Sequence, residues 1–572
     1  MDNDMPTGPR AVREVADAYV DGLARLDPGT AAFLGVPAAR GEMPDLSPDG
    51  RAALDGLSRT TLRELDRAER SAGALSDVER RCGRLLRERL EADLALGTDD
   101  EYLREVVNVY GLQQRVQGVF QMMPTGDADD WAHVAERMDR VPDTLAGFRE
   151  SLTGNLEKDR FVAAPAQVHV IAGQLDAWVR DGDGRGWYAG FCADADADAP
   201  APLRSALDGA ATRAVAATAE LRDWLRDAYL PRTEGRPDGV GADRYRTWAR
   251  FWTGAEPDLH ETYAWGWAEY RRIRDEMRAE AERVRPGAGV REAMRHLDAH
   301  GEAEEGVEAI RLRLQGWMDQ ALADLDGTLF DLAPPVRVVE AAIAPAGSGS
   351  AAYYTAPSVD FSRPGRTWLP TQGRTRFPLW SLRSVWYHEG VPGHHLQLAQ
   401  WRHLADSLST YQTTVGGIDA CTEGWAMYAE RLMDELGHLP TAGDRLGFLD
   451  WQMLRALRVV LDIGAHLALR IPEDSPVGAG RTWTPALAKE FLALHSGQTP
   501  GFVDSEIGRY LGLPGQAISY KLGERAWLDG RAAAEAAHAA RGERLDLKAW
   551  HMSALSLGPL GLRDLQEELA GL

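Results

Sequence analysis

The chain has 572 residues, of which 44% are hydrophobic, and it carries a formal net charge of −23 at pH 7. This composition allows a large buried core, and the acidic balance excludes nucleic acid or an anionic membrane as the expected main partner. No run of 18 apolar residues occurs, so no segment is predicted to cross a bilayer. Residues 1–19 are polar and acidic, unlike a signal peptide, and the three cysteines form no CxxC pair. We therefore expect a cytoplasmic location.

Helical periodicity dominates the chain from its start. Apolar residues recur at i, i+3, i+4 and i+7 in residues 13–35, 77–96, 134–152, 206–230, 259–284 and much of 382–436. Alternation typical of strands is sparse, and residues 336–344 and 366–372 are the better candidates. These patterns predict a mainly α fold with a small β-sheet before the histidine-rich segment. We expect a largely helical N-terminal part, residues 1–335, and a catalytic part, residues 336–572, within one integrated fold.

The segment WYHEGVPGHHLQ (Trp386 to Gln397) carries the strongest chemical signal. His388 and Glu389 open like the zinc-peptidase helix HExxH, but the second histidine of that pattern is displaced to His394 or His395. On a regular helix His388 and His395 lie about 10 Å apart along the axis, at about 1.5 Å per residue, too far to share a zinc ion. A bulge at residues 391–393, caused by the Pro-Gly pair, would bring His394 beside His388. We predict a metal site there.

A third ligand is expected from the segment CTEGWAMYAERL that follows. Catalytic zinc usually has three protein ligands and one position left for water. Glu423 and Glu430 share a helix face at i and i+7, and the apolar neighbours of Glu423 favour it as the ligand. Glu430 is the alternative, or it holds a ligand histidine through a hydrogen bond.

These motifs, HEGVPGHHLQ followed by EGWAMYAE, resemble the family catalogued as domain of unknown function 885, a family of zinc peptidases. The resemblance runs almost from end to end, through SVDFSRPG, LRALRVVLDIGAH and EIGRYLGLPGQAISYKLG. It implies an elongated multi-helix fold with a deep central channel and a small sheet next to the HE-containing helix, similar to thimet oligopeptidase and angiotensin-converting enzyme. It also implies one zinc ion per chain on His388, His394 and Glu423, with Glu389 as general base.

Further side chains are candidates for catalysis or for substrate binding. Amide hydrolysis creates an oxyanion that needs a hydrogen-bond donor, and Tyr520 and His395 are the two candidates. The candidate substrate contacts are Arg509, Tyr510, Lys521 and His466. Arginine suits a substrate carboxylate because it offers two parallel donors, whereas His466 could equally form an ion pair with Asp462.

The expected activity is hydrolysis of short peptides by a zinc-dependent metallopeptidase. Phe361 and Pro370 depart from the family pattern, and a proline cannot donate to a substrate-pairing edge strand. We therefore expect activity restricted to dipeptide-sized or smaller amides. The alternatives are a zinc amidohydrolase for a specialised small amide or modified amino acid, and a catalytically silent binding protein. The presence of Glu389 argues against the silent protein, because a binding module has no use for a base beside the metal.

Overall fold

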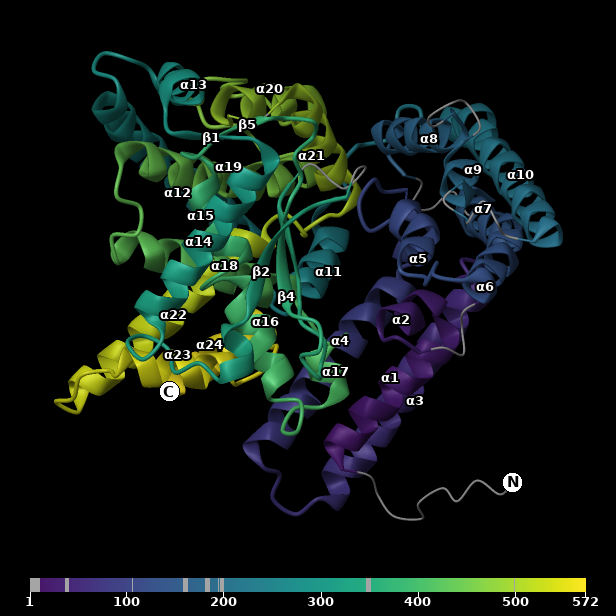
Figure 1. Ribbon diagram of the computed structural model, residues 1–572, viewed down its shortest axis with the longest axis horizontal. Coiled ribbons are helices and arrows are strands. Elements are labelled where there is room, and N and C mark those ends of the chain that lie inside the picture. The colour runs from purple at the N-terminus through teal and green to yellow at the C-terminus, as the bar shows by residue number, and fades with distance from the viewer. Residues whose placement is uncertain are drawn as a thin grey trace. The chain divides into compact units, whose positions relative to one another are not determined.

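The computed structural model of the protein describes residues 11–36, 41–104, 106–157, 163–180, 186–193, 195, 200–345, 351–497 and 499–572. Its architecture is mainly α with two small sheets, which confirms the predicted fold class in its main feature (Figure 1). The channel implied by the family resemblance stays a prediction. No helix among the described residues has both the length and the apolar character that crossing a membrane requires.

The chain divides into two compact units, each discontinuous in sequence. Unit 1 contains residues 1–73, 90–244 and 505–513, and unit 2 contains residues 74–89, 245–504 and 514–572. The sequence analysis instead expects one boundary between residues 335 and 336. Both strand candidates and the histidine-rich segment belong to unit 2.

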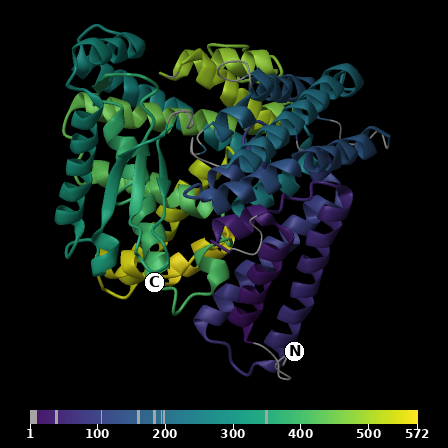
Figure 2. The same ribbon diagram turned by 45° about the vertical axis from the view of Figure 1, so that its right-hand side comes forward.

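In unit 1, the helices between residues 113 and 229 pack on an apolar core that includes Phe120, Trp131 and Tyr188. Helices α1 and α3 run side by side in both views (Figure 1, Figure 2). The predicted helix over residues 13–35 is interrupted because the Asp27 side chain accepts from the amides of Gly29 and Thr30 and starts a new helix. Its helices are α1 (Val12–Leu26), α2 (Pro28–Phe33), α3 (Pro48–Ser71), η2 (Glu101–Arg104), η3 (Gln113–Gln117), α5 (Gly118–Gln121), α6 (Ala128–Asp139), α7 (Val141–Glu157), α8 (Pro165–Arg180), α9 (Trp187–Cys192), α10 (Ala201–Trp224), η4 (Leu225–Tyr229) and η5 (Leu230–Arg232).

Three helices have residues in both units: α4 (Asp77–Thr98), α11 (Ala242–Thr253) and α21 (Pro500–Gly512). The remaining helices belong to unit 2. They are α12 (Leu259–Val284), α13 (Val290–His300), α14 (Val307–Leu325), η6 (Pro334–Arg337), α15 (Leu382–Glu389), α16 (His394–His403), α17 (Thr410–Thr413), α18 (Asp419–Glu435), α19 (Ala442–His466), α20 (Pro485–His495), α22 (Ser519–Ala540), α23 (Leu547–Leu555) and α24 (Leu562–Gly571).

Helices α18 and α22 of unit 2 approach each other closely at a pair of glycines. A Cβ atom on Gly424 would lie 2.4 Å from the carbonyl carbon of Gly523, so neither position has room for a side chain. Helix α19 is buried along almost its whole length and packs against α12 and α15. This core places the polar side chains of α18, α19 and α22 where water is largely excluded.

The three-stranded sheet lies against the histidine-rich helices, and β4 contacts α16 while β2 contacts α14 (Figure 1). Its order is β2 (Val339–Ile343), β4 (Gly365–Leu369) and β3 (Tyr353–Thr355), with β2 parallel and β3 antiparallel to β4. Residues 339 and 353 of the outer strands pair with Gly365 and Trp368 of β4. Strands β1 (Ala303–Glu305) and β5 (Arg376–Pro378) form a separate antiparallel pair. Both predicted strand regions therefore contain strands.

The expectation for Pro370 is wrong in one respect. Pro370 follows Leu369, the last residue of β4, and therefore interrupts no strand. Strand β4 is also the central strand of its sheet and already has a partner on each side. A proline beyond the end of a central strand removes no ladder hydrogen bond.

Candidate metal centre

The histidine-rich segment folds as two helices joined by a tight turn, and not as the single bulged helix that the spacing predicts. Helix α15 ends at Glu389 and α16 begins at His394. The Gly393 amide donates to the Tyr387 carbonyl at 2.9 Å, and a Cβ on Gly393 would lie 1.9 Å from the His388 carbonyl oxygen. Only glycine permits this close approach. The turn brings the rings of His388 and His394 to 4.8 Å between centroids.

His388, His394 and Glu423 form a group that could hold a metal ion. One ligand atom from each lies within 4.8 Å of the others, and both histidines are buried. Oε2 of Glu423 lies 3.2 Å from Nε2 of His388 and 3.8 Å from Nε2 of His394. Ligand atoms at zinc bond lengths of about 2.0–2.1 Å in tetrahedral geometry lie about 3.4 Å apart, so the group has the right dimensions. The donor set, two imidazoles and one carboxylate, also fits a catalytic zinc site.

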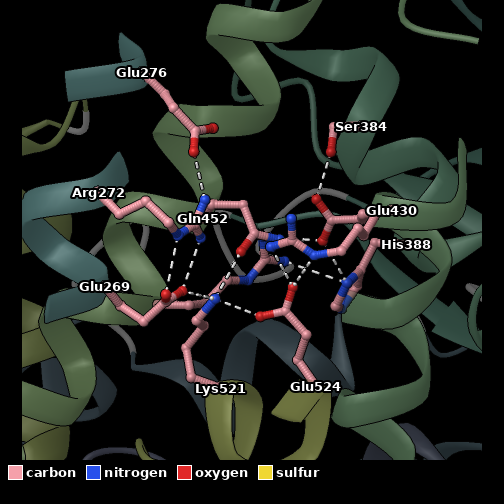
Figure 3. Close-up of polar contacts among 11 residues, drawn as sticks. Glu269, Arg272, Glu276, Ser384, His388, Glu430, Gln452, Lys521 and Glu524 are labelled. Carbon is pink, nitrogen blue, oxygen red and sulfur yellow. Dashed lines mark hydrogen bonds and ion pairs between the residues drawn. The ribbon is translucent and has the colours of Figure 1, made fainter. Parts of the chain in front are cut away.

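The orientation of His388 is set by contacts at Nδ1, and Figure 3 shows the partners Glu430 and Ser384. Its Nδ1 lies 2.8 Å from Oε1 of Glu430, a carboxylate that is fully buried. The Ser384 hydroxyl donates to the other Glu430 oxygen. Because a carboxylate accepts, Nδ1 of His388 carries a proton, and Nε2, which faces Glu423, is the nitrogen that could bind an ion. Glu430 therefore contacts a histidine of the metal-binding group, as in one of the two roles that the sequence left open.

Glu389 lies beside the group. Its Oε2 is 3.9 Å from Nε2 of His394, and the side chain is largely buried. Burial, together with the charge of nearby Glu423, raises the pKa of the Glu389 carboxyl to about 8. A cation held by the neighbouring group would favour the ionised carboxylate, which is the form that a general base needs. Burial also lowers the pKa of His394 to about 4, so this imidazole is neutral at pH 7 and can act as a ligand.

His395 points away from the group and is held by two hydrogen bonds. Its Nε2 donates to the Val336 carbonyl at 2.7 Å, and its Nδ1 lies 2.8 Å from the Tyr354 hydroxyl. Burial lowers the pKa of His395 to about 4, so Nδ1 accepts from that hydroxyl. Both ring nitrogens are thereby engaged with η6 and β3. His395 is not a member of the metal-binding group.

Tyr520 and His466 each contact a charged side chain of α19. The Tyr520 ring, at the start of α22, packs under the Arg458 guanidinium at 4.4 Å from Cζ to the ring centroid. Nε2 of His466 lies 3.6 Å from Oδ1 of Asp462, so the expected contact between these two residues is present. Asp462 also accepts from the Tyr245 hydroxyl at 2.6 Å and from the Gly515 amide at 2.9 Å.

Lys521 lies in a buried network of charged groups on α12, α19 and α22 (Figure 3). Its ammonium donates to Gln452 at 3.0 Å and contacts the carboxylates of Glu524 and Glu269, the latter at 3.0 Å. Only 1% of the Lys521 side chain is exposed. The charge of Lys521 is thus met by two carboxylates within its own unit.

Arg509 and Tyr510 belong to unit 1, where both contact the same carboxylate. Oε2 of Glu506 lies 2.8 Å from Nη2 of Arg509 and 2.7 Å from the Tyr510 hydroxyl. All three side chains are buried. The donors that the sequence assigns to a substrate carboxylate therefore already bind a carboxylate of the chain.

Two residues next to the metal-binding group are absent from the sequence-based candidates. Ser384 lies four residues before His388, one helical turn away on the same face, and this spacing could have revealed it. Arg455 lies on α19, with Nη1 at 3.0 Å from Oε1 of Glu430. An arginine among the many apolar residues between Leu446 and Ile463 predicts a buried cation with a partner, but the sequence does not say which partner.

Fold and site together define a mainly α protein with a buried His₂Glu group that could bind a metal ion. The chain belongs to the family described as "Bacterial protein of unknown function (DUF885)", whose profile matches residues 28–569. This confirms the resemblance inferred from the sequence. No curated protein matches the chain.

Two solved structures have a similar fold. One, described as a "putative lipoprotein" from Colwellia psychrerythraea, has a TM-score of 0.82 at 20% identity, over 99% of each chain. The other, described as a "putative lipoprotein of unknown function" from Shewanella oneidensis, has a TM-score of 0.72 at 19% identity, over 98% of this chain and 99% of that one. At these identities the similarity shows the shared fold and nothing about activity.

Proposed function

We propose that the protein is a zinc-dependent hydrolase that cleaves amide bonds in short peptides. The observation that carries this proposal is the position of Glu389 beside the group of His388, His394 and Glu423. A site that only stores or senses a metal needs no further carboxylate beside its ligands. A hydrolase needs one there, because water must lose a proton as it attacks the carbonyl carbon.

Zinc is the proposed ion because two imidazoles and one carboxylate, with a position left for water, are a recurrent catalytic zinc set. When bound, such an ion polarises a carbonyl group and makes a water molecule more acidic. His388 and His394 would present Nε2 to it, and Glu423 would present Oε2. One ion per chain is expected.

The side chains around the ion have separate proposed roles. Glu389 accepts a proton from the attacking water and passes it to the departing amine nitrogen. Tyr520 donates a hydrogen bond to the oxyanion, and we prefer it to His395 because both nitrogens of His395 already have partners. Glu430 keeps His388 in the tautomer with Nε2 unprotonated.

The proposed substrates are short peptides. The structure gives no support to the expectation, drawn from Pro370, that activity is limited to dipeptide-sized amides. That limit rested on an interrupted strand, but β4 is intact up to Leu369. A zinc amidohydrolase acting on a specialised small amide remains the second candidate, since Glu389 would serve the same chemistry there.

The experiment that tests the proposal compares the zinc-loaded protein with Glu389→Gln on a panel of peptides, dipeptides and N-acyl amino acids. We expect zinc content to stay constant and hydrolysis to fall by about 10²–10⁴ in the variant, the usual contribution of a general base. Glu435→Gln is the matched control, because this glutamate lies on the same helix as Glu423 with its side chain 45% exposed. Hydrolysis at the parent rate in Glu389→Gln would contradict the proposal. A zinc-loaded parent that cleaves nothing on the panel would favour a binding protein.

The proposed location is the cytoplasm. Cys82, Cys192 and Cys421, all in the described part of the chain, form no disulfide, which is compatible with a reducing compartment. The two similar structures are described as lipoproteins, a name that points to the cell envelope for those proteins. Fractionation of cells that produce the protein would separate the two locations.

A further inference from the structure

A buried arginine on α19, Arg455, contacts His388 of the metal-binding group and the carboxylate of Glu430. Nη1 of Arg455 lies 3.0 Å from Oε1 of Glu430, and Nη2 lies 3.3 Å from Nδ1 of His388. Its side chain is 4% exposed, and Cζ lies 5.3 Å from the centroid of the Trp451 ring. A charged side chain so far from water is costly unless it has a partner, and Glu430 is that partner.

Glu430 receives donors on both of its oxygens. Ser384 donates to Oε2, while His388 and Arg455 both meet Oε1. These three contacts come from α15 and α19, so the carboxylate is fixed relative to two helices at once. Without Arg455, the anion would keep only the donors of Ser384 and His388 among these contacts.

Two contacts compete at Nδ1 of His388. This atom either donates to Glu430 or accepts from Arg455, and the two choices leave opposite tautomers. The Glu430 contact is shorter, at 2.8 Å against 3.3 Å. A lone pair on Nδ1 would face the Glu430 carboxylate at 2.8 Å, so the shorter contact favours Nδ1 as a donor and leaves Nε2 as the nitrogen that can bind an ion.

We propose that Arg455 is a positioning residue of the metal centre: it holds Glu430 as an oriented anion, and Glu430 in turn aims Nε2 of His388 at the ion. The inference rests on the proposed metal site. It also balances charge, because Arg455 and a divalent ion together offset the carboxylates of Glu389, Glu423 and Glu430. A buried site with matched charges avoids the penalty of an uncompensated ion.

The neighbouring network provides a matched control. Arg431 follows Glu430 in sequence, but its guanidinium turns to Glu524, with Nη2 at 2.8 Å from Oε1. Glu524 is 2% exposed, so Arg431→Ala breaks an ion pair to a buried carboxylate of the same unit. Arg431 contacts neither His388 nor Glu430 in the contacts described above.

The test is a competition titration of zinc against a chromophoric chelator, with the wild type, Arg455→Ala, Arg455→Lys and Arg431→Ala. We expect Arg455→Ala to bind zinc about 10–100-fold more weakly, the usual effect of removing an outer partner of a ligand. Arg455→Lys should recover part of this loss, because it restores the charge without the planar fork. Arg431→Ala should bind zinc as the wild type does, even where its stability falls as much as that of Arg455→Ala.

Two results would overturn the inference: wild-type zinc affinity in Arg455→Ala, or equal weakening in Arg431→Ala. If Arg455→Ala does not fold, Arg455→Met combined with Glu430→Gln replaces it, since this pair leaves no buried charge alone. The double variant should bind zinc as weakly as Glu430→Gln by itself, and an additional loss would contradict the inference. A wild type that binds no zinc in the same titration would contradict the proposed function instead.

Discussion

His394 and His395 are neighbours in sequence, and their replacement should have opposite consequences. His394 belongs to the metal-binding group, and its Nδ1 has no hydrogen-bond partner among the described residues. His395 is fully buried and has a partner at each nitrogen. We therefore expect His394→Ala to lose zinc with a modest effect on stability, and His395→Ala to keep zinc with a large one.

The expected loss of stability for His395→Ala follows from its two partners. Removing the ring leaves the Val336 carbonyl and the Tyr354 hydroxyl without their hydrogen bonds, at a cost of about 1–3 kcal/mol each. The free energy of unfolding should then fall by about 2–6 kcal/mol, a large part of the ~5–15 kcal/mol typical of a domain.

The measurements are elemental analysis of the purified variants and denaturant unfolding of each. His403→Ala is the control, because this histidine lies at the exposed end of the same helix. It should match the wild type in both measurements. Zinc retained in His394→Ala together with zinc lost in His395→Ala would refute this reasoning and make His395 the second ligand.

Three further predictions concern stability, catalysis and substrate size. Burial raises the pKa of Asp450 to about 7, so the stability that is present below about pH 4 is lost as the pH rises to about 7. Asp450→Asn keeps an oxygen for the Gly497 amide, so this variant should remove the loss and be up to about 4 kcal/mol more stable than the wild type at pH 8. An unchanged pH profile of unfolding in the variant would contradict this prediction. Tyr520→Phe should lower kcat by about 10² with zinc content unchanged, whereas the parent rate would exclude it as the oxyanion donor. In a mass-spectrometric survey of a peptide library, we expect cleavage of short peptides longer than dipeptides, because Pro370 interrupts no strand and gives no reason for the narrower limit; cleavage of dipeptides alone would restore the narrower activity.

Much of the metal centre could be predicted from the sequence because its spacing is local. The separation of His388 from His394, with a Pro-Gly pair between them, requires a break in the helix. The sequence could not show that the break is complete. Termination of α15 depends on the fit of Gly393 against the His388 carbonyl, a contact between backbone atoms that leaves no pattern of side chains.

The surroundings of the centre could not be predicted, because they depend on contacts between distant segments. Arg455 on α19 forms an ion pair with Glu430 on α18, and no periodicity within α19 identifies that partner. The role of β4 as a central strand likewise depends on pairing with β2 and β3, which the alternation of residues 366–372 does not reveal. Periodicity predicts which face of an element is buried, but not which neighbour covers it.

The central claim, a metal ion on His388, His394 and Glu423, is tested most directly by anomalous diffraction at the zinc edge from crystals of the zinc-loaded protein. We predict one strong peak per chain, at about 2.0–2.2 Å from Nε2 of His388, Nε2 of His394 and Oε2 of Glu423. A map with no peak among these three atoms, or with its strongest peak on other residues, would contradict the account.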